Sequence, residues 1–427
     1  MKVVLINPPS PFLINQKSFI PLGLLALAGY IRQETEHEVQ VLDLSNEEGR
    51  LAAALKEFEG DVLGVSATTP QYPHACAILS ALRQVAPKAT AVIGGVHASC
   101  VPDRCVADGW DYVVVGEGER AIVRLLDTLR QGTAIARIIP AQVVEDPDTL
   151  PFPAYEAVDL AQYGYDIDGH KALTAITSRG CPFECSFCSK DVWPRKVRFH
   201  SPEYVERMVR HIRQDLQYQY LQLLDDTLVL KKDRLLEICR LLDPLDVRFR
   251  CYGHVRGCTS EVLHALKRAG CVEIGIGIES GSQRILDAVG KPATIEENLA
   301  MVERCREAGI ASNVFIMIGL PGESRETVAE THAWMERARP DKFGYNIFMP
   351  YLGTPIYNHP ERYDIQLFPV EEEHAWVKGR QGEYHAYVAT SALTREEIIE
   401  LFTAEFQFFT ELTRWRPGYN ERLVRAD

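Results

Sequence analysis

The chain has 427 residues, of which 46% are hydrophobic and 25% are charged, as in an ordinary globular protein with room for two or three domains. Its formal net charge of −13 disfavours nucleic acid or an anionic membrane as a partner. The sequence has no apolar run of about 18 residues and no signal-peptide pattern at its start, so we expect no membrane span and a cytoplasmic location.

Residues 1–140 alternate between short apolar runs and helical patterns. Apolar runs that end in glycine, proline or hydroxyl residues predict strands at 2–7, 39–43, 61–66, 91–95 and 112–116. The intervening patterns predict helices at 22–33, 51–58, 74–85 and 119–130. This alternation predicts an α/β domain with a parallel, Rossmann-like doubly wound sheet. Sheets of this kind bind ligands at the carboxyl ends of their strands.

Glycines and polar residues gather at those predicted strand ends. The candidate ligand-binding residues are Asn7, Ser66, Thr68, Gly94, Gly95, His97, Gly116, Glu117 and Gly118. Glycine lets a ligand approach the backbone closely, and free amides and hydroxyls suit a polar cofactor tail. Any one of these residues is equally well explained as part of a turn. The sequence has no GxGxxG motif and no P-loop lysine, so nucleotide binding lacks support.

Residues 141–169 contain three spaced prolines and little apolar periodicity, which predicts an ordered connector. A second α/β region is expected at 170–350. Its predicted strands are 173–177, 220–226, 248–252, 272–279, 311–318 and 342–348. Its predicted helices are 202–214, with Ser201 as N-cap, then 232–242, 260–269, 295–308 and 325–337.

Three cysteines, Cys181, Cys185 and Cys188, lie within eight residues just after Gly180. Buried structural cysteines do not cluster in this way, and a disulfide would leave one thiol over. A zinc site would need a fourth ligand, and no second ligand pair is evident. Three thiolates on one loop suit a four-iron cluster with one iron open to a ligand. The other eight cysteines are scattered and are expected to be reduced thiols.

This loop, with the aromatic Phe187 before its last cysteine, resembles that of the radical S-adenosylmethionine (SAM) superfamily. The resemblance implies a [4Fe-4S] cluster, SAM bound to its open iron, a 5′-deoxyadenosyl radical and an external electron donor of the flavodoxin or ferredoxin type. It also implies that the six strand–helix units form a partial (β/α)6 barrel with its site at the carboxyl ends of the strands.

The same resemblance assigns SAM contacts to several strand ends. The residues it implies are Asp225 or its neighbour Asp226 for the amino group, Glu279 and Ser280 for the ribose, Ile318 and Leu320 for the adenine, and Arg256 for the carboxylate. Two adjacent carboxylates on a strand point to opposite faces, so one of the aspartates is expected to hold the next loop instead. For Arg256, a surface salt bridge is the alternative.

The N-terminal region resembles the cobalamin-binding domain that precedes the radical SAM domain in one branch of that superfamily. It lacks the Asp-x-His-x-x-Gly motif, so the resemblance implies that no protein histidine ligates cobalt from below. We expect Ser66 and Thr68 to hold the cofactor tail, His97 to lie near the corrin periphery, and His74 to be a less favoured helper.

Residues 351–427 are expected to form a small, mainly helical cap. A helix is predicted at 394–413 from apolar residues at helical spacing, and the loop 371–388 is where we expect substrate selectivity.

Together the resemblances imply a methyltransferase that uses SAM, cobalamin and the cluster to methylate an unactivated carbon of a small-molecule or natural-product substrate. In that scheme the methyl group passes through methylcobalamin. A cyclase, ring-contracting or oxidative enzyme without methyl transfer is the alternative. A non-catalytic cobalamin or iron–sulfur sensor is the alternative of another class. The sequence identifies no residue that contacts the substrate.

Overall fold

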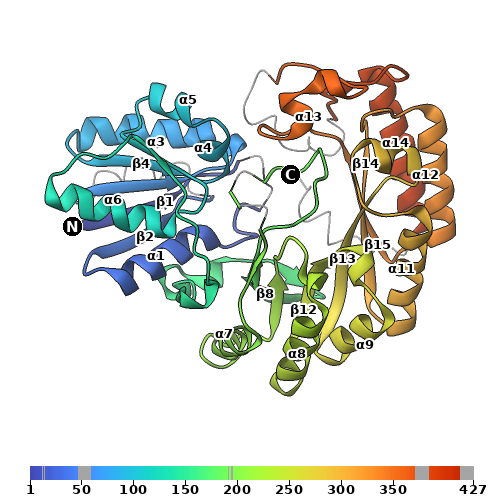
Figure 1. The fold of residues 1–427 in the computed structure, drawn as a ribbon, viewed down its shortest axis with the longest axis horizontal. Helices are drawn as coiled ribbons and strands as arrows, with labels where there is room; N and C mark the ends of the chain where they lie inside the picture. Colours follow the sequence, from blue (N-terminus) through green and yellow to red (C-terminus); the bar gives the residue numbers. More distant parts are fainter. Residues whose placement is uncertain are drawn as a thin grey trace.

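The structure is a computed structural model, and it describes residues 1–11, 13, 15–46, 59–190, 192–193, 196–370 and 384–413. The helix predicted at 51–58 and the greater part of the loop predicted at 371–388 lie outside these residues. Two α/β units lie side by side, and the described C-terminal region up to residue 413 packs against the second (Figure 1).

The first unit is built on a six-stranded parallel sheet in the order β2-β1-β3-β4-β5-β6. Its strands are β1 (Lys2–Asn7), β2 (Glu38–Asp43), β3 (Val62–Ser66), β4 (Thr90–Gly94), β5 (Tyr112–Val115) and β6 (Ile138–Pro140). Its helices are α1 (Leu22–Glu34), α3 (Tyr72–Val85), α4 (Val96–Cys100), α5 (Pro102–Ala107) and α6 (Glu119–Gln131).

Both faces of this sheet are covered, which explains why β1 is apolar at every central position. Val3 and Leu5 face the core that contains α1 and α6. Val4 and Ile6 face the opposite core, which contains α3. Successive side chains of a strand point to opposite faces, so a strand covered on both sides needs apolar residues throughout. The predicted doubly wound sheet is confirmed.

The second unit is a curved seven-stranded sheet in the order β15-β14-β13-β12-β11-β8-β7, in which only the short β7 is antiparallel to its neighbour. Its strands are β7 (Asp166–Ile167), β8 (His170–Ala175), β11 (Tyr220–Leu223), β12 (Arg248–Gly253), β13 (Cys271–Glu279), β14 (Ala311–Ile318) and β15 (Lys342–Ile347). Its helices are α7 (Pro202–Gln214), α8 (Lys232–Leu242), α9 (Ser260–Arg268), α10 (Gln283–Ala288), α11 (Ile295–Ala308) and α12 (Arg325–Ala338).

The six parallel strands of this sheet form the predicted partial barrel, with helices on its outer side (Figure 1). Helix α7 begins as predicted, because the Ser201 hydroxyl accepts a hydrogen bond from the Tyr204 amide. A separate antiparallel ribbon, β9 (Ser178–Arg179) with β10 (Arg198–Phe199), brackets the segment that carries the three cysteines.

The connector joins the two units through its own packing. The amide of Ala154 donates to the Leu25 carbonyl at 3.0 Å, and the Tyr155 hydroxyl donates to the Thr174 carbonyl at 3.0 Å. Tyr155 is fully buried in a hydrophobic core that runs from α1 to the barrel. This connector thus contacts both units, while its bounds at 141–169 stay a prediction, and its last part, β7, pairs with β8 in the second sheet.

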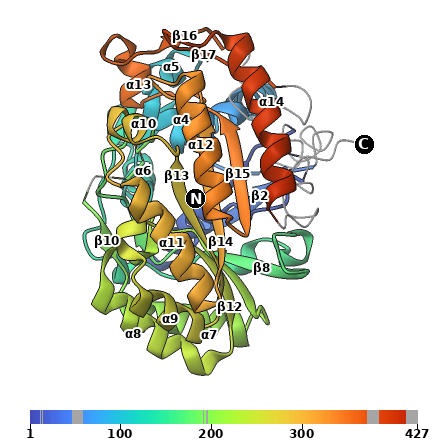
Figure 2. The same ribbon diagram turned by 90° about the vertical axis from the view of Figure 1, so that its right-hand side faces the viewer.

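The C-terminal region adds α13 (Pro355–Asn358), the ribbon β16 (Gln366–Leu367) with β17 (Val388–Ala389), and α14 (Arg395–Leu412). Helix α14 lies along β15 and α12 (Figure 2). Its Phe402 stacks on Tyr345 of β15, with ring centroids 4.9 Å apart. No helix in the described part of the chain combines the length and the apolar character needed to cross a membrane.

Candidate cofactor sites between the two sheets

A cavity of about 420 Å³ opens at the carboxyl ends of the N-terminal strands and runs between the sheet and helix α1. Its lining includes almost the whole predicted set: Asn7, Ser66, Thr68, Gly94, Gly95, Gly116, Glu117 and Gly118. The inner walls are apolar, with Leu5, Val92 and Val114 from the strands. An apolar slot with polar groups at its mouth suits an elongated cofactor tail.

Glycine is required at the mouth of this cavity for geometric reasons. Gly95 has a φ of +90°, and a Cβ there would lie 2.8 Å from the Ser66 hydroxyl oxygen and 3.0 Å from backbone atoms of Ala67. Gly116 has a φ of +77°, and its Cβ would lie 2.7 Å from that of Ala141. Both positions therefore combine a left-handed backbone with close packing that a larger residue would disturb.

His97 does not line this cavity. Its ring is buried and stacks on Tyr72 with 3.9 Å between ring centroids, and its Nδ1 lies 3.2 Å from the Thr69 hydroxyl. The expected contact of His97 with the corrin periphery stays a prediction without geometric support here. The cavity is lined instead by His200 of the barrel, whose ring stacks on Tyr204 and whose Nδ1 lies 3.3 Å from an Asp148 oxygen.

Asn7 lies at the mouth of the cavity, but neighbours already occupy its amide group. Its side-chain nitrogen donates to Asp43 at 2.8 Å and to Ser45 at 3.1 Å. Glu117 is likewise occupied, because its carboxylate accepts hydrogen bonds from two barrel arginines, Arg179 and Arg198. The sequence reading treated Glu117 as a cofactor ligand and missed both arginines.

The loop of the three cysteines follows Gly180, which has a φ of +92°. Hydrogen bonds hold it to two other segments: the Ser186 amide donates to the Val289 carbonyl at 2.9 Å, and the Ile356 amide donates to the Ser186 carbonyl at 3.2 Å. Phe183 stacks on His254 at 4.0 Å between ring centroids. The predicted Phe187 packs against the main core. Because these contacts hold the loop from several segments, its three thiols have a fixed arrangement.

Burial raises the pKa of all three loop thiols, and that of Cys188 to about 11. Thiolates here therefore need a cationic partner, which iron would supply. Within the described ranges, no three cysteine, histidine or acidic side chains converge tightly enough to chelate one ion. A four-iron cluster needs no such convergence, because each cysteine binds a different iron. The donor set therefore fits the predicted cluster.

Of the two aspartates after β11, the structure directs Asp225 to the cysteine loop. Its buried carboxylate accepts from the Thr177 amide at 3.2 Å, from the Thr177 hydroxyl at 2.9 Å and from the Ser178 hydroxyl. Burial raises the pKa of Asp225, and these hydrogen bonds oppose that effect. Asp226 is the more exposed of the two, although burial still raises its pKa and the Gly180 amide at the start of the cysteine loop donates a hydrogen bond to its carboxylate.

Glu279 ends β13 in the left-handed region, with a φ of +65°, and its carboxylate pairs with Lys291 at 2.8 Å. Burial would lower the pKa of Lys291, but the charge of Glu279 overcomes it and raises that pKa. A non-glycine residue held at positive φ marks backbone strain of the kind found at functional sites. Lys291 was missed because nothing in the sequence pairs it with Glu279.

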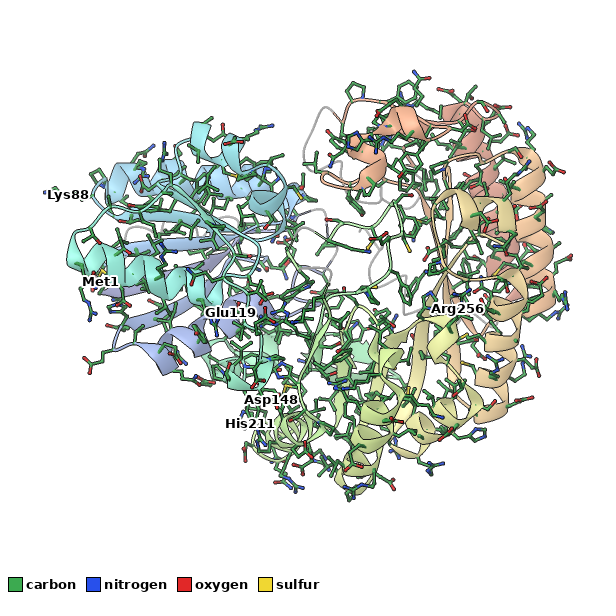
Figure 3. All side chains as sticks on the ribbon, viewed as in Figure 1. Met1, Lys88, Glu119, Asp148, His211 and Arg256 are labelled. Atoms are coloured by element: carbon green, nitrogen blue, oxygen red, sulfur yellow. The ribbon has the colours of Figure 1, made fainter. Side chains whose placement is uncertain are left out.

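The remaining predicted SAM contacts fall into three situations. Ser280 is buried, with its hydroxyl oxygen 3.2 Å from that of Thr331. Ile318 and Leu320 are buried, and the amide of Gly319 between them donates to the Glu323 carboxylate at 3.2 Å. Arg256 is half-exposed and pairs with Glu297 at 3.1 Å, which is the surface salt bridge left open as its alternative. Figure 3 labels it on the barrel, far from Glu119 at the junction of the two units.

Two family models match the chain. The B12 binding domain model matches residues 16–126, and the radical SAM superfamily model matches residues 175–335. An uncharacterized methyltransferase of Pyrococcus horikoshii, PH0819, is 30% identical over 388 residues, which cover 84% of this chain and 83% of that protein. An anaerobic magnesium-protoporphyrin IX monomethyl ester cyclase of Cereibacter sphaeroides is 27% identical, covering 78% of this chain and 58% of the cyclase.

Among solved structures, the radical SAM methyltransferase TsrM of Kitasatospora setae, with cobalamin and a [4Fe-4S] cluster bound, superposes with a TM-score of 0.75 at 18% identity. The match covers 100% of this chain and 91% of that one. The chain therefore belongs to the radical SAM superfamily, in the group whose members also carry a cobalamin-binding domain. The predicted resemblance, fold and cofactor set are confirmed, and the chain is an enzyme of the methyltransferase type.

Proposed function

We propose that this enzyme transfers a methyl group from SAM, by way of cobalamin, to an unactivated carbon of a small-molecule substrate. The observation that carries the proposal is the meeting of two strand ends. Glu117, just after β5, contacts Arg179, just before the cysteine loop, at 3.1 Å. The carboxyl edge of the cobalamin-type sheet therefore faces the entry of the cluster loop, as a transfer between two cofactors requires.

When bound, the cluster and SAM supply a 5′-deoxyadenosyl radical, and the cobalamin carries the methyl group. Cys181, Cys185 and Cys188 would hold the cluster. Glu279, fixed by Lys291, and Asp226 would hold polar groups of SAM, while the strand end at Ile318 and Leu320 would face its base. We assign these residues to orientation of the reactants and exclusion of water.

The cobalamin tail would enter the slot between the sheet and α1, where Ser66 and Thr68 offer polar atoms at the mouth. The apolar walls and the glycine-rich rim of the slot together support this assignment to the cobalamin tail. An electron donor of the flavodoxin or ferredoxin type would reduce the cluster. The substrate would lie between the two units, beside the cysteine loop.

The direct test uses anaerobically reconstituted protein, reductant and SAM. Wild-type protein should bind about four irons per chain and release 5′-deoxyadenosine. Cys185→Ala should lose both, because one iron loses its thiolate. Cys76→Ala is the matched control, since it removes a thiol of α3, outside the cysteine loop. A Cys185→Ala protein that releases 5′-deoxyadenosine at the wild-type rate would overturn the proposal.

One observation favours a second function, because the 27% identical relative is a cyclase. The two functions differ in the fate of SAM: methyl transfer yields S-adenosylhomocysteine as well as 5′-deoxyadenosine, and cyclisation without methyl transfer yields only the latter. Measuring both products with reduced cobalamin present separates them. Absence of both in protein with a full cluster would point to the sensor alternative.

A further inference from the structure

Four charged side chains are buried where the two units meet. They are Glu117 and Glu119 from the first unit and Arg179 and Arg198 from the second, each at most 8% exposed. Arg179 donates to Glu117 at 3.1 Å and to Glu119 at 2.6 Å. Arg198 donates to the same Glu117 carboxylate at 2.9 Å and to the Val144 carbonyl at 2.7 Å. We call this group the interdomain clamp.

The two arginines occupy paired positions on the ribbon β9–β10, where Arg179 lies directly opposite Arg198. The segment between them, residues 180–197, carries the three cysteines. The Glu117 carboxylate therefore forms hydrogen bonds at both ends of that segment. On its own side, Glu117 lies between Gly116 and Gly118, which line the cofactor cavity with it. The clamp touches the slot and the cysteine loop together.

The electrostatics favour one fixed geometry. Burial alone would lower the pKa of Arg179, but the charges of Glu119 and Glu117 outweigh it and raise that pKa. Two carboxylates and two guanidiniums balance in charge, and an unpaired member would be a buried charge without compensation. A planar guanidinium also fixes the direction of the hydrogen bonds it donates, whereas a lysine ammonium does not. The Trp193 ring, which lines the cavity, covers Arg179 with 4.9 Å between its centroid and the guanidinium carbon.

We propose that the interdomain clamp sets the distance and orientation of the cobalamin slot relative to the cluster loop, with Glu117 as the positioning residue that joins them. The inference rests on the proposed function, because the spacing of the two cofactor sites matters only if a methyl group passes between them. Sequence alone made Glu117 a cofactor ligand, whereas its contacts make it the part that holds one site against the other.

The test compares Glu117→Gln, a neutral isostere, with Glu145→Gln. Glu145 pairs with Lys196 at 2.8 Å in the same neighbourhood, but both side chains are largely exposed, so that pair contributes little. Two activities can be measured without the substrate. Release of 5′-deoxyadenosine depends on the cluster and SAM alone. Methyl transfer from SAM to reduced cobalamin is monitored by the absorbance of cobalamin and by the formation of S-adenosylhomocysteine. In the second, the methyl group leaves the sulfonium without the bond's electron pair, and cob(I)alamin supplies the pair that forms the new bond.

Glu117→Gln should slow methyl transfer to cobalamin by about a hundredfold and slow 5′-deoxyadenosine release far less, because only methyl transfer needs the two cofactor sites to be aligned with each other. Glu145→Gln should leave every value as in the wild type. A proportionate loss of both activities would overturn the proposal, because it would mean that Glu117 only helps to fold the cysteine loop. Wild-type rates of methyl transfer in Glu117→Gln would overturn it as well.

A readout without turnover makes the test independent of the proposed function. Electron paramagnetic resonance of protein loaded with cob(II)alamin and reduced cluster reports the coupling of the two spins, which falls steeply with their separation. The coupling should weaken in Glu117→Gln and persist in Glu145→Gln; an unchanged coupling refutes the clamp. If Glu117→Gln does not fold, the double variant Glu117→Gln with Arg198→Gln removes one charge of each sign and should show the same weakened coupling. Should the wild type transfer no methyl group, the proposed function fails while the spin coupling still decides the clamp.

Discussion

His97 offers a prediction that separates a structural role from a cofactor role. It follows β4 in the short helix α4 and is 1% exposed, stacked against Tyr72. Burial lowers its pKa from 6.5 to about 4, with Arg104 adding to the effect and Asp108 opposing it. His97→Asn keeps a polar group of similar reach and removes the titration. We therefore expect this variant to change how stability depends on pH rather than how the protein binds cobalamin.

The sign and size follow from linkage. In the unfolded chain the imidazole takes up a proton near pH 6.5, whereas in the folded protein it stays neutral down to about pH 4. Protons thus favour the unfolded chain in this window, and stability is lost as the pH falls from 6.5 towards 4. Between pH 7 and pH 5 the loss amounts to about 2 kcal/mol of unfolding free energy.

The assay is urea unfolding at a series of pH values for the wild type, His97→Asn and His74→Asn, a half-buried control on α3. The stability gap between His97→Asn and the wild type should shift in favour of the variant by about 2 kcal/mol on going from pH 7 to pH 5. Cobalamin affinity, from an absorbance titration, should match the wild type in both. A flat gap for His97→Asn together with weakened cobalamin binding would refute this reasoning and restore His97 to the cofactor site.

Three further outcomes test other parts of the structure. Gly95→Val should weaken cobalamin binding by about tenfold or more in an absorbance titration, because a side chain at φ +90° meets Ser66 and the neighbouring backbone. Glu273→Gln should lower the unfolding free energy by about 3 kcal/mol in urea melts, because its buried carboxylate faces both Arg250 at 2.9 Å and Lys342 at 2.6 Å. Thr394→Ala should lower it by about 1 kcal/mol, through loss of the capping box that begins α14; an unchanged midpoint would contradict that cap's role.

Periodicity predicted the long elements and failed for the short ones. Strands such as β1 and β14 and helices such as α1 and α11 lie where the apolar spacing placed them, because each buries a full face over several turns or alternations. The two- and three-residue strands β7 and β6 were not predicted. The helices α4, α5 and α10 have five or six residues, which is too short for a helical period to emerge. The strand predicted at 220–226 ends at Leu223, because Asp225 turns away to accept hydrogen bonds from Thr177 and Ser178.

Motifs identified the residues whose chemistry is unusual and missed those whose role depends on a distant partner. Three cysteines in eight residues are improbable in any ordinary core, so the sequence alone reveals them. Arg179 and Arg198 meet Glu117 across 62 and 81 residues of chain, and no local pattern announces such a pair. The same holds for Lys291, whose partner Glu279 was predicted only as a ribose contact implied by the resemblance.

The common cause is that strand ends serve two purposes that sequence does not distinguish. In a parallel sheet every strand delivers its last residues to one edge, so that edge gathers polar groups whether they bind a ligand or another part of the chain. Here Glu117 and Asp225 both sit at such edges, and both hold the segments that lead into the cysteine loop. A polar residue at a strand end therefore predicts which region of the fold contains the site. Its role within that region follows only when its partners are known: buried Asp225 bonds Thr177 and Ser178, and the more exposed Asp226 beside it bonds the Gly180 amide.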